Sequence, residues 1–199
     1  MPRPKSKSQD QLVTAAMQHF WAFGFGSTSM DELVSAIGTS RHAIYTECGG
    51  KNELFLLCLQ AYQETVVSPA FESVEAEGAD ISAIETYFEA QIERAEAMGP
   101  PYPGCLIANT TAETASQTPK VVAAIEHHNA RLKAGFRNAI LNTDDRETGM
   151  SDVELDQLAE FLAISAQGLW LFSKSVKEVG VLRHYARTLT SLIEKRIKG

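Results

Sequence analysis

The 199-residue sequence predicts an all-α protein, with a small N-terminal three-helix unit and a larger C-terminal helical domain. Apolar residues recur every three to four positions along most of the chain, the spacing of a buried helix face, which suggests about nine helices in total. From residue 51 onward no segment alternates apolar and polar residues as a half-buried strand does. With 199 residues, 44% of them hydrophobic, the chain can form one large hydrophobic core and a second, smaller one in a small additional domain.

The first predicted helix lies within residues 10–23. Leu12, Ala16 and Phe20 are spaced at i, i+4 and i+8, so they share one face. Gly24 then stands where a helix C-cap is expected, because glycine adopts the required backbone conformation easily. This segment is predicted to be the packing helix of the three-helix unit.

A short second helix is predicted to begin at Thr28 and Ser29. Each of these residues precedes an acidic residue by three positions, an arrangement that caps the free N–H groups of a helix start. Leu33 and Ile37 then give the spacing of a buried stripe, and Gly38 permits a sharp turn.

A third short helix follows the turn at once. Thr39 or Ser40 caps its start, and Gly49-Gly50 ends it before Lys51 opens the next helix. Ile44 is predicted to face inward. The residues predicted to face outward are Arg41, His42 and Thr46.

Residues 10–62 resemble the DNA-binding domain of the TetR (tetracycline repressor) family of bacterial transcription regulators. The matching positions are Thr28, Leu33, Val34, Ile37, Gly38, Ser40, Ile44, Tyr45, Gly49, Lys51, Glu53, Leu54 and Phe55. The resemblance implies a helix-turn-helix unit whose third helix enters the major groove. We expect Arg41, His42 and Thr46 to contact base edges. Phosphate contacts are expected from Thr28, Ser29, Ser40, Tyr45 and Lys51, and Thr39 completes the expected DNA-binding set.

Residues 1–9 are predicted to be a flexible basic arm. Arg3, Lys5 and Lys7 supply three of the five basic residues in residues 1–60, which carry no net charge, whereas residues 61–199 carry the whole net charge of −7. Such an arm can follow a DNA groove, and the alternative is a solvated terminal tail.

Residues 69–199 are predicted to form an effector-binding and dimerisation domain, and the last helix of the DNA-binding domain is predicted to continue to about residue 68. Helices are expected near 51–67, 82–97, 105–114, 119–141, 153–177 and 181–198, since proline, glycine or polar runs interrupt the pattern between them. Pro69 is the first of these breaks. Residues 105–113 also resemble the sixth-helix segment of many TetR-family effector domains.

The last two helices indicate contact with a second copy of the chain. One apolar stripe of the helix near 153–177 runs through Leu162 and Leu169 and another through Phe161 and Ile164, so one protomer does not easily cover both. The family resemblance implies a four-helix interface with a symmetry mate, and the alternative is an intramolecular core. The expected interface residues are Leu155, Leu158, Leu162, Leu169, Phe172, Val176, Leu182, Tyr185, Leu189 and Leu192.

A small-molecule site is expected inside the larger domain, between the helices near 82–97, 105–114 and 153–177. Apolar side chains line such sites and a few polar groups orient the ligand, whereas the alternative for each ring is ordinary core packing. Cys105 stands at an expected helix start, where a lowered thiol pKa suits a redox or electrophile sensor; the alternative is a small packed thiol. The expected lining residues are Tyr62, Phe88, Ile92, Tyr102, Cys105, Asn109, Thr110, His128, Phe136, Phe161, Gln167 and Trp170.

Nothing in the sequence points to catalysis, a cofactor or a metal ion. The three cysteines form no C-x-x-C pair, and the adjacent His127 and His128 diverge by about 100° on a helix. No run reaches the roughly 18 apolar residues of a membrane span, and the N-terminus lacks the apolar core of a signal peptide, so a cytoplasmic location is expected.

The sequence therefore predicts a homodimeric repressor that a small molecule releases from a palindromic operator. An alternative is an activator or co-regulator controlled by a protein partner or by thiol modification at Cys105, and a third possibility is an enzyme that uses the helical cavity. The expected partners are double-stranded operator DNA, a small-molecule effector and a second copy of the chain, with no cofactor and no membrane.

Overall fold

The computed structural model describes residues 7–113, 118–143 and 149–198. Within these ranges the regular structure is helical and contains no strand, which confirms the predicted all-α class. The elements are α1 (Gln9–Phe23), α2 (Met30–Ile37), α3 (Arg41–Cys48), α4 (Lys51–Tyr62), the π-helix η1 (Gln63–Val67), α5 (Ser68–Glu75), α6 (Ile81–Met98), α7 (Leu106–Thr111), α8 (Pro119–Thr143), α9 (Asp152–Ser173) and α10 (Gly180–Lys198).

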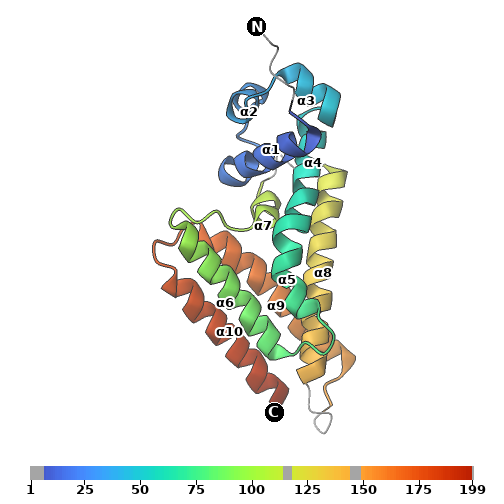
Figure 1. Cartoon of the computed structure of the whole chain (residues 1–199). Helices are drawn as coiled ribbons and strands as arrows, with labels where there is room; N and C mark the ends of the chain where they lie inside the picture. The colour runs from blue at the N-terminus through green and yellow to red at the C-terminus, as the bar shows by residue number, and fades with distance from the viewer. Residues whose placement is uncertain (1–6, 114–117, 144–148, 199) are drawn as a thin grey trace.

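Figure 1 shows an elongated molecule in which α1, α2 and α3 form one end. The long rod of α4, η1 and α5 leads away from this end and runs beside α8, while α6, α9 and α10 complete the other end. The short helix α7 lies beneath α1, between the two parts of the molecule. None of the described helices is both long enough and apolar enough to cross a membrane.

Serine caps fix the starts of the first three helices. Ser8 accepts from the backbone of Gln11, and the side chain of Gln11 bonds back to Ser8. Because α1 begins at Gln9, the arm before it is shorter than predicted, and residues 1–6, which include Arg3 and Lys5, lie outside the described residues. Ser29 caps α2 through a reciprocal pair of bonds with Glu32.

Ser40 caps α3 by accepting from the amide of Ala43, which decides between the two predicted capping residues. The chain turns between α2 and α3 at Gly38, whose φ of 60° is left-handed and favours glycine. The sequence motif therefore produces the helix-turn-helix that it predicts.

The predicted break at Pro69 is wrong, because the chain continues from α4 through η1 into α5. Pro69 lies in the first turn of α5, directly after the π-helical turn. Proline lacks a backbone N–H group and cannot donate a helical hydrogen bond. The loss is small at this position, because the π-helical turn shifts the hydrogen-bond register and already leaves amide groups without a helical partner. The rod therefore extends to Glu75.

Most other helix boundaries agree with the sequence prediction to within two or three residues. The exception that matters is α9, which ends at Ser173 and leaves Val176 in the following turn. The larger domain packs around an aromatic cluster in which the ring centroids of Phe71 and Phe136 lie 5.3 Å apart and those of Phe88 and Phe136 6.3 Å apart.

Candidate functional site

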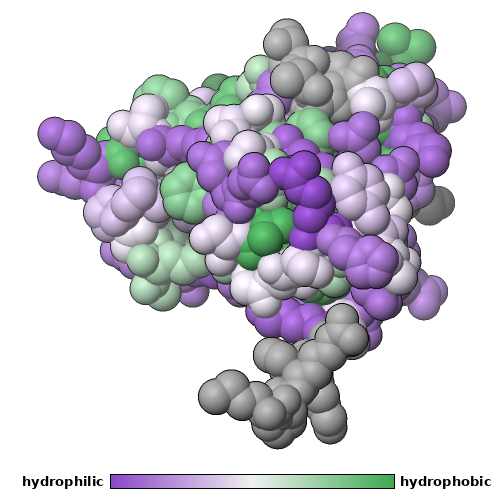
Figure 2. Space-filling view, turned by 90° about the horizontal axis from the view of Figure 1, so that it is seen from above, coloured by the Kyte–Doolittle hydropathy of each residue, from purple (hydrophilic) through white to green (hydrophobic). Residues whose placement is uncertain are grey.

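The recognition helix α3 presents a polar outer face. Ile44 is fully buried, whereas Arg41, His42, Tyr45 and Thr46 are exposed. Figure 2 looks onto this end of the molecule and shows mostly hydrophilic and neutral side chains, with hydrophobic residues in small spots. This division follows from the helical period, because Ile44 anchors α3 and the residues around it turn away from the core.

An ion pair joins the two short helices. The guanidinium of Arg41 donates to the carboxylate of Asp31 on α2 at 2.7 Å, and both side chains are largely exposed. Asp31 therefore holds the base-reading candidate Arg41 and places a negative charge on the same surface. A pair this exposed contributes little to stability, so it can exchange for another anion.

Lys51 occupies a more structural position than the sequence suggests. Its ammonium donates to the carbonyl oxygen of Phe25 at 2.8 Å and lies 4.1 Å from the centre of the Phe25 ring. Partial burial lowers its pKa, and the carboxylates of Glu113 and Glu32 counteract this effect. Lys51 therefore ties the start of α4 to the loop before α2, with two further N–H donors for other partners.

Thr28 does not offer its side chain to DNA in this structure. It is 2% exposed, and its hydroxyl donates to the carbonyl oxygen of Gly24 at 2.6 Å. The expected contact between its hydroxyl and a phosphate is therefore wrong for this structure, because the hydroxyl is hydrogen-bonded within the loop before α2. Ser29 is exposed at the N-terminus of α2, while Thr39 and Ser40 lie at the turn before α3.

Only the end of the predicted basic arm is described. The ammonium of Lys7 donates to the carbonyl oxygen of Ile37 at the C-terminal end of α2. The carbonyl groups at a helix C-terminus favour a cation, so this contact is electrostatically matched. Lys7 thus packs on the helix-turn-helix rather than extending from it.

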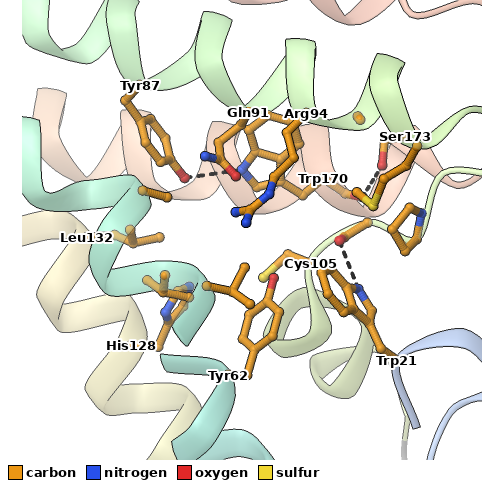
Figure 3. Close-up of a pocket in the computed structure, with 17 residues that line it drawn as sticks. Trp21, Tyr62, Tyr87, Gln91, Arg94, Cys105, His128, Leu132, Trp170 and Ser173 are labelled. Carbon is orange, nitrogen blue, oxygen red and sulfur yellow. Dashed lines mark hydrogen bonds between the residues drawn. The ribbon is translucent and has the colours of Figure 1, made fainter. Parts of the chain in front are cut away.

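The second candidate site is a cavity of about 60 Å³ where the larger domain meets α1 and the rod. Figure 3 shows side chains converging on it from α1, the rod, α6, α8, α9 and the loop before α7. The lining residues are Trp21, Tyr62, Val66, Val67, Ala70, Tyr87, Gln91, Arg94, Ala95, Met98, Pro103, Gly104, Cys105, His128, Leu132, Trp170 and Ser173.

Four of the residues expected at the cavity line it, namely Tyr62, Cys105, His128 and Trp170. The sequence prediction missed Trp21, Tyr87, Gln91 and Arg94. The position of Trp21 could have been inferred from the sequence. This large apolar residue lies beside the buried stripe of α1, so a second element has to pack against it.

The remaining expected residues lie elsewhere. Phe88, Ile92 and Phe136 are at most 1% exposed and form the packed core, and Tyr102 is also buried without lining the cavity. Phe161 is 47% exposed on α9, so its assignment to an interior site is wrong. For most of the aromatic residues that were expected to line a ligand site, the structure therefore favours the alternative of ordinary core packing.

The expected polar residues outside the cavity have other local contacts. The Asn109 amide donates to the Pro103 carbonyl at 2.9 Å, and the Thr110 hydroxyl donates to the Leu106 carbonyl at 2.7 Å. The Gln167 amide donates to Asn129 at 3.0 Å, in a surface groove of about 630 Å³ between α8 and α9. Asn109 and Thr110 are buried away from the cavity, and Gln167 lines the surface groove, so none of the three lines the cavity.

The cavity contains an uncharged histidine. His128 is 3% exposed, and the amide nitrogen of Gln63 bonds to its Nδ1 at 2.8 Å. Burial, together with the positive charges of Arg131 and His127, lowers the pKa of His128 to about 4. At neutral pH the ring is therefore a polar but neutral group.

Cys105 does not show the properties of a reactive thiol. It is 8% exposed, and burial raises the pKa of its thiol. The Ala108 amide, the Tyr62 hydroxyl and the Ile107 amide all act to lower this pKa, but the cost of desolvating the thiolate is larger. The structure therefore favours the packed-thiol alternative over the sensor.

Two hydrogen bonds connect the larger domain to the N-terminal helices, and the first of them involves the cavity wall. The indole N–H of Trp21 on α1 donates to the Gly104 carbonyl oxygen at 3.0 Å, and its ring packs edge-on against Tyr62 with centroids 5.0 Å apart. The Gly26 amide, in the loop before α2, donates to Glu113 at 2.8 Å. A change in the cavity thus reaches α1 directly.

The exposed apolar surface of the larger domain lies on α9 and α10. Of the expected interface residues, Leu155, Leu162, Leu169, Leu182 and Leu189 are at most 4% exposed within the protomer, so their assignment to an interface is wrong. Leu158 and Val176 are half-buried. The expected residues that remain exposed are Phe172, Tyr185 and Leu192. Together with four other exposed apolar residues of the same two helices they are hereafter called the α9–α10 patch, whose members are Phe161, Ile164, Leu171, Phe172, Val181, Tyr185 and Leu192.

Comparison with known proteins agrees with this geometry. The family description "Bacterial regulatory proteins, tetR family" matches residues 12–58, and "Tetracyclin repressor-like, C-terminal domain" matches residues 81–189. The chain is 25% identical over 201 residues to the uncharacterized HTH-type transcriptional regulator YezE of Bacillus subtilis (strain 168), covering 98% of this chain and 100% of the relative.

Two further relatives extend the likeness. The chain is 23% identical over 197 residues to the HTH-type transcriptional repressor ComR of Escherichia coli (strain K12), covering 98% of this chain and 93% of ComR. A cysteine mutant of the TetR family regulator CifR, solved with 26-bp double-strand operator DNA, has a TM-score of 0.78 at 20% identity, covering 95% of this chain and 98% of CifR. The CifR likeness shows a shared fold.

Proposed function

Since the chain belongs to the TetR family of DNA-binding transcriptional regulators, we propose that it acts as a homodimeric repressor that a small molecule releases from operator DNA. The observation that carries this proposal is the exposed polar face of α3 at the end of a fold shared with an operator-bound regulator. Arg41, His42 and Thr46 contact base edges in the major groove, while Ser29, Thr39, Ser40 and Tyr45 approach the phosphates. Lys51 adds a positive charge at the start of α4, and the N-terminal basic residues follow the DNA backbone.

The α9–α10 patch supports the proposed dimer. It exposes seven large apolar side chains on two neighbouring helices, which is unusual for a monomer surface. A twofold pairing of these helices buries the patch against its own copy, because a symmetric interface uses the same surface twice. Such a dimer presents two copies of α3 to half-sites about 34 to 36 Å apart.

The cavity supports the proposed ligand response. At about 60 Å³ it is smaller than the 300 Å³ or more of typical ligand pockets, so a ligand of ordinary size enters only if the walls move apart. A ligand that enlarges the cavity displaces Trp21 and Gly104, which form its wall on the side of α1. Because α1 packs on the helices that carry α3, this displacement changes the spacing of the two recognition helices.

The choice of a repressor rests on the full-length relative ComR, which is named a repressor. Control by thiol modification at Cys105 receives no support from its buried thiol with a raised pKa. DNase footprinting of the purified protein on the DNA upstream of its own gene tests the proposal. A protected inverted repeat that disappears with a metabolite supports it, whereas the absence of any protected site overturns it.

A further inference from the structure

We propose that the cavity binds a small monocarboxylate whose anionic head pairs with the Arg94 guanidinium and whose apolar body lies among the aromatic rings. This inference rests on the proposed ligand response and specifies the chemical class of the ligand.

The lining of the cavity carries positive charge and no negative charge. Of the 17 residues that line it, Arg94 is the single permanently charged one, and none is an aspartate or glutamate. His128 adds no charge at neutral pH, because its pKa is lowered to about 4. A cationic ligand is therefore disfavoured, a neutral acceptor forms a weaker hydrogen bond with the guanidinium, and an anionic one forms a stronger, charge-assisted bond.

Arg94 lacks the partner that the other arginines have. Every other arginine within the described ranges lies within 4.0 Å of a carboxylate, and these are Arg41, Arg131, Arg137, Arg183, Arg187 and Arg196. Arg94 is an exposed side chain on the rim of the cavity, and it has neither an ion pair nor a hydrogen bond with any described residue. Figure 3 shows its guanidinium directed from α6 toward the middle of the cavity. The N–H fork of an unpaired guanidinium matches a carboxylate.

Two neighbouring groups provide further donors. Gln91 lies one helical turn before Arg94 on α6 and also lines the cavity. The Tyr87 hydroxyl accepts from the Trp170 indole at 3.3 Å, and burial raises the pKa of Tyr87, so its own proton stays available for donation. Donors at one side of an apolar cavity fix the orientation of an anionic head.

The size of the cavity limits the ligand. A volume of about 60 Å³ accommodates a few water molecules, which corresponds to roughly four to six non-hydrogen atoms of ligand before the walls move. The walls next to this space are the rings of Trp21, Tyr62 and Trp170. A short aliphatic acid fits the space, and a single-ring aromatic acid fits after the walls move apart.

The test uses the full-length protein and matched pairs of acid and amide. Propionate, butyrate and benzoate are titrated beside propionamide, butyramide and benzamide, with calorimetry and tryptophan emission as readouts. Arg94→Gln removes the charge, Arg94→Lys keeps it, and Arg187→Gln removes one positive charge on α10 outside the cavity. Thermal unfolding of each variant establishes that it is folded.

The expected result is that at least one acid binds the wild type and that its amide binds at least tenfold more weakly, as for a charge-assisted hydrogen bond. Arg94→Gln should lower the affinity for the acid by about tenfold or more, Arg94→Lys by less, and Arg187→Gln by less than twofold. Equal binding of acid and amide, unchanged acid binding in Arg94→Gln, or no binding of any acid overturns the inference.

A parallel operator-binding measurement separates this inference from the proposed function. An acid that binds through Arg94 but leaves operator affinity unchanged supports the ligand class and contradicts the ligand-released repressor. A neutral compound that releases operator DNA equally from the wild type and Arg94→Gln supports the repressor and overturns the ligand class.

Discussion

The indole nitrogen of Trp21 donates a hydrogen bond to the carbonyl oxygen of Gly104 at 3.0 Å, and this bond joins the first helix to the loop that closes the cavity. Gly104 has a φ of 70°, and a Cβ added to it would lie 2.7 Å from the Trp170 carbonyl oxygen. The backbone that accepts the bond therefore requires glycine, and the bond joins one residue of the cavity wall on α1 to another in the loop before α7.

Trp21→Phe should weaken this contact while keeping a ring in the cavity wall. The lost hydrogen bond lowers the free energy of unfolding by about 1 kcal/mol. Hydrogen–deuterium exchange should become faster in peptides from α1 and α7. Trp170→Phe is the matched control, because its indole bonds to Tyr87 within the larger domain, and it should leave exchange in α1 unchanged. Equal exchange in α1 for the wild type and Trp21→Phe would show that this bond does not couple the two parts.

Asp31→Asn should strengthen operator binding. The change releases Arg41 from its ion pair and removes a carboxylate from the DNA-facing surface. An exposed pair of this kind contributes up to about 1 kcal/mol, so we expect affinity to rise by roughly twofold to fivefold in fluorescence anisotropy. Glu178→Gln, an exposed carboxylate near α10, controls for the change in net charge. Weaker binding by Asp31→Asn would indicate that Asp31 positions Arg41 for the bases instead.

Ile164→Glu should dissociate the dimer without unfolding the protomer. Ile164 is 67% exposed in the α9–α10 patch, so a charge there opposes burial at the interface but not folding. Leu162→Glu, two residues earlier, is the contrasting variant, because Leu162 is fully buried and its replacement should unfold the domain. Sedimentation velocity and circular dichroism distinguish the two outcomes. A folded dimer of Ile164→Glu would place the interface elsewhere.

Stability should fall in acid because of His128. Its folded pKa of about 4 lies below the ordinary value, so the unfolded chain binds a proton that the native protein does not as the pH falls from 7 to 4. The free energy of unfolding should decrease over this window by up to about 3 kcal/mol from this residue. Urea unfolding of His128→Gln should lack that part of the pH dependence. His127→Gln, at the exposed neighbouring position, should keep it, and equal slopes in His128→Gln and wild type would refute the assignment.

The sequence predicted local features better than contacts between distant helices. Caps such as Ser29 with Glu32 depend on residues three positions apart, and the structure has them as expected. The two apolar stripes of α9 look equivalent in sequence, and only the packing of α8 and α10 decides that Leu162 faces the core and Ile164 the exterior.

The cavity was predicted less well for the same reason. Its wall combines Trp21 from α1 with Arg94 from α6, and no local pattern reveals that these helices meet. Rings such as Phe88 and Phe136 have the same helical spacing whether they line a cavity or fill a core. The sequence therefore located the domain that holds the cavity but identified only part of its lining.

In the proposed repressor, two copies of α3 read paired DNA sites. Selection of binding sites by the purified protein from a random library of duplex DNA measures this pairing. We expect enrichment of an inverted repeat whose half-sites are centred one helical turn, about 10 base pairs, or a small multiple of it apart. Enrichment of no sequence, or of a single unrepeated site, would contradict it.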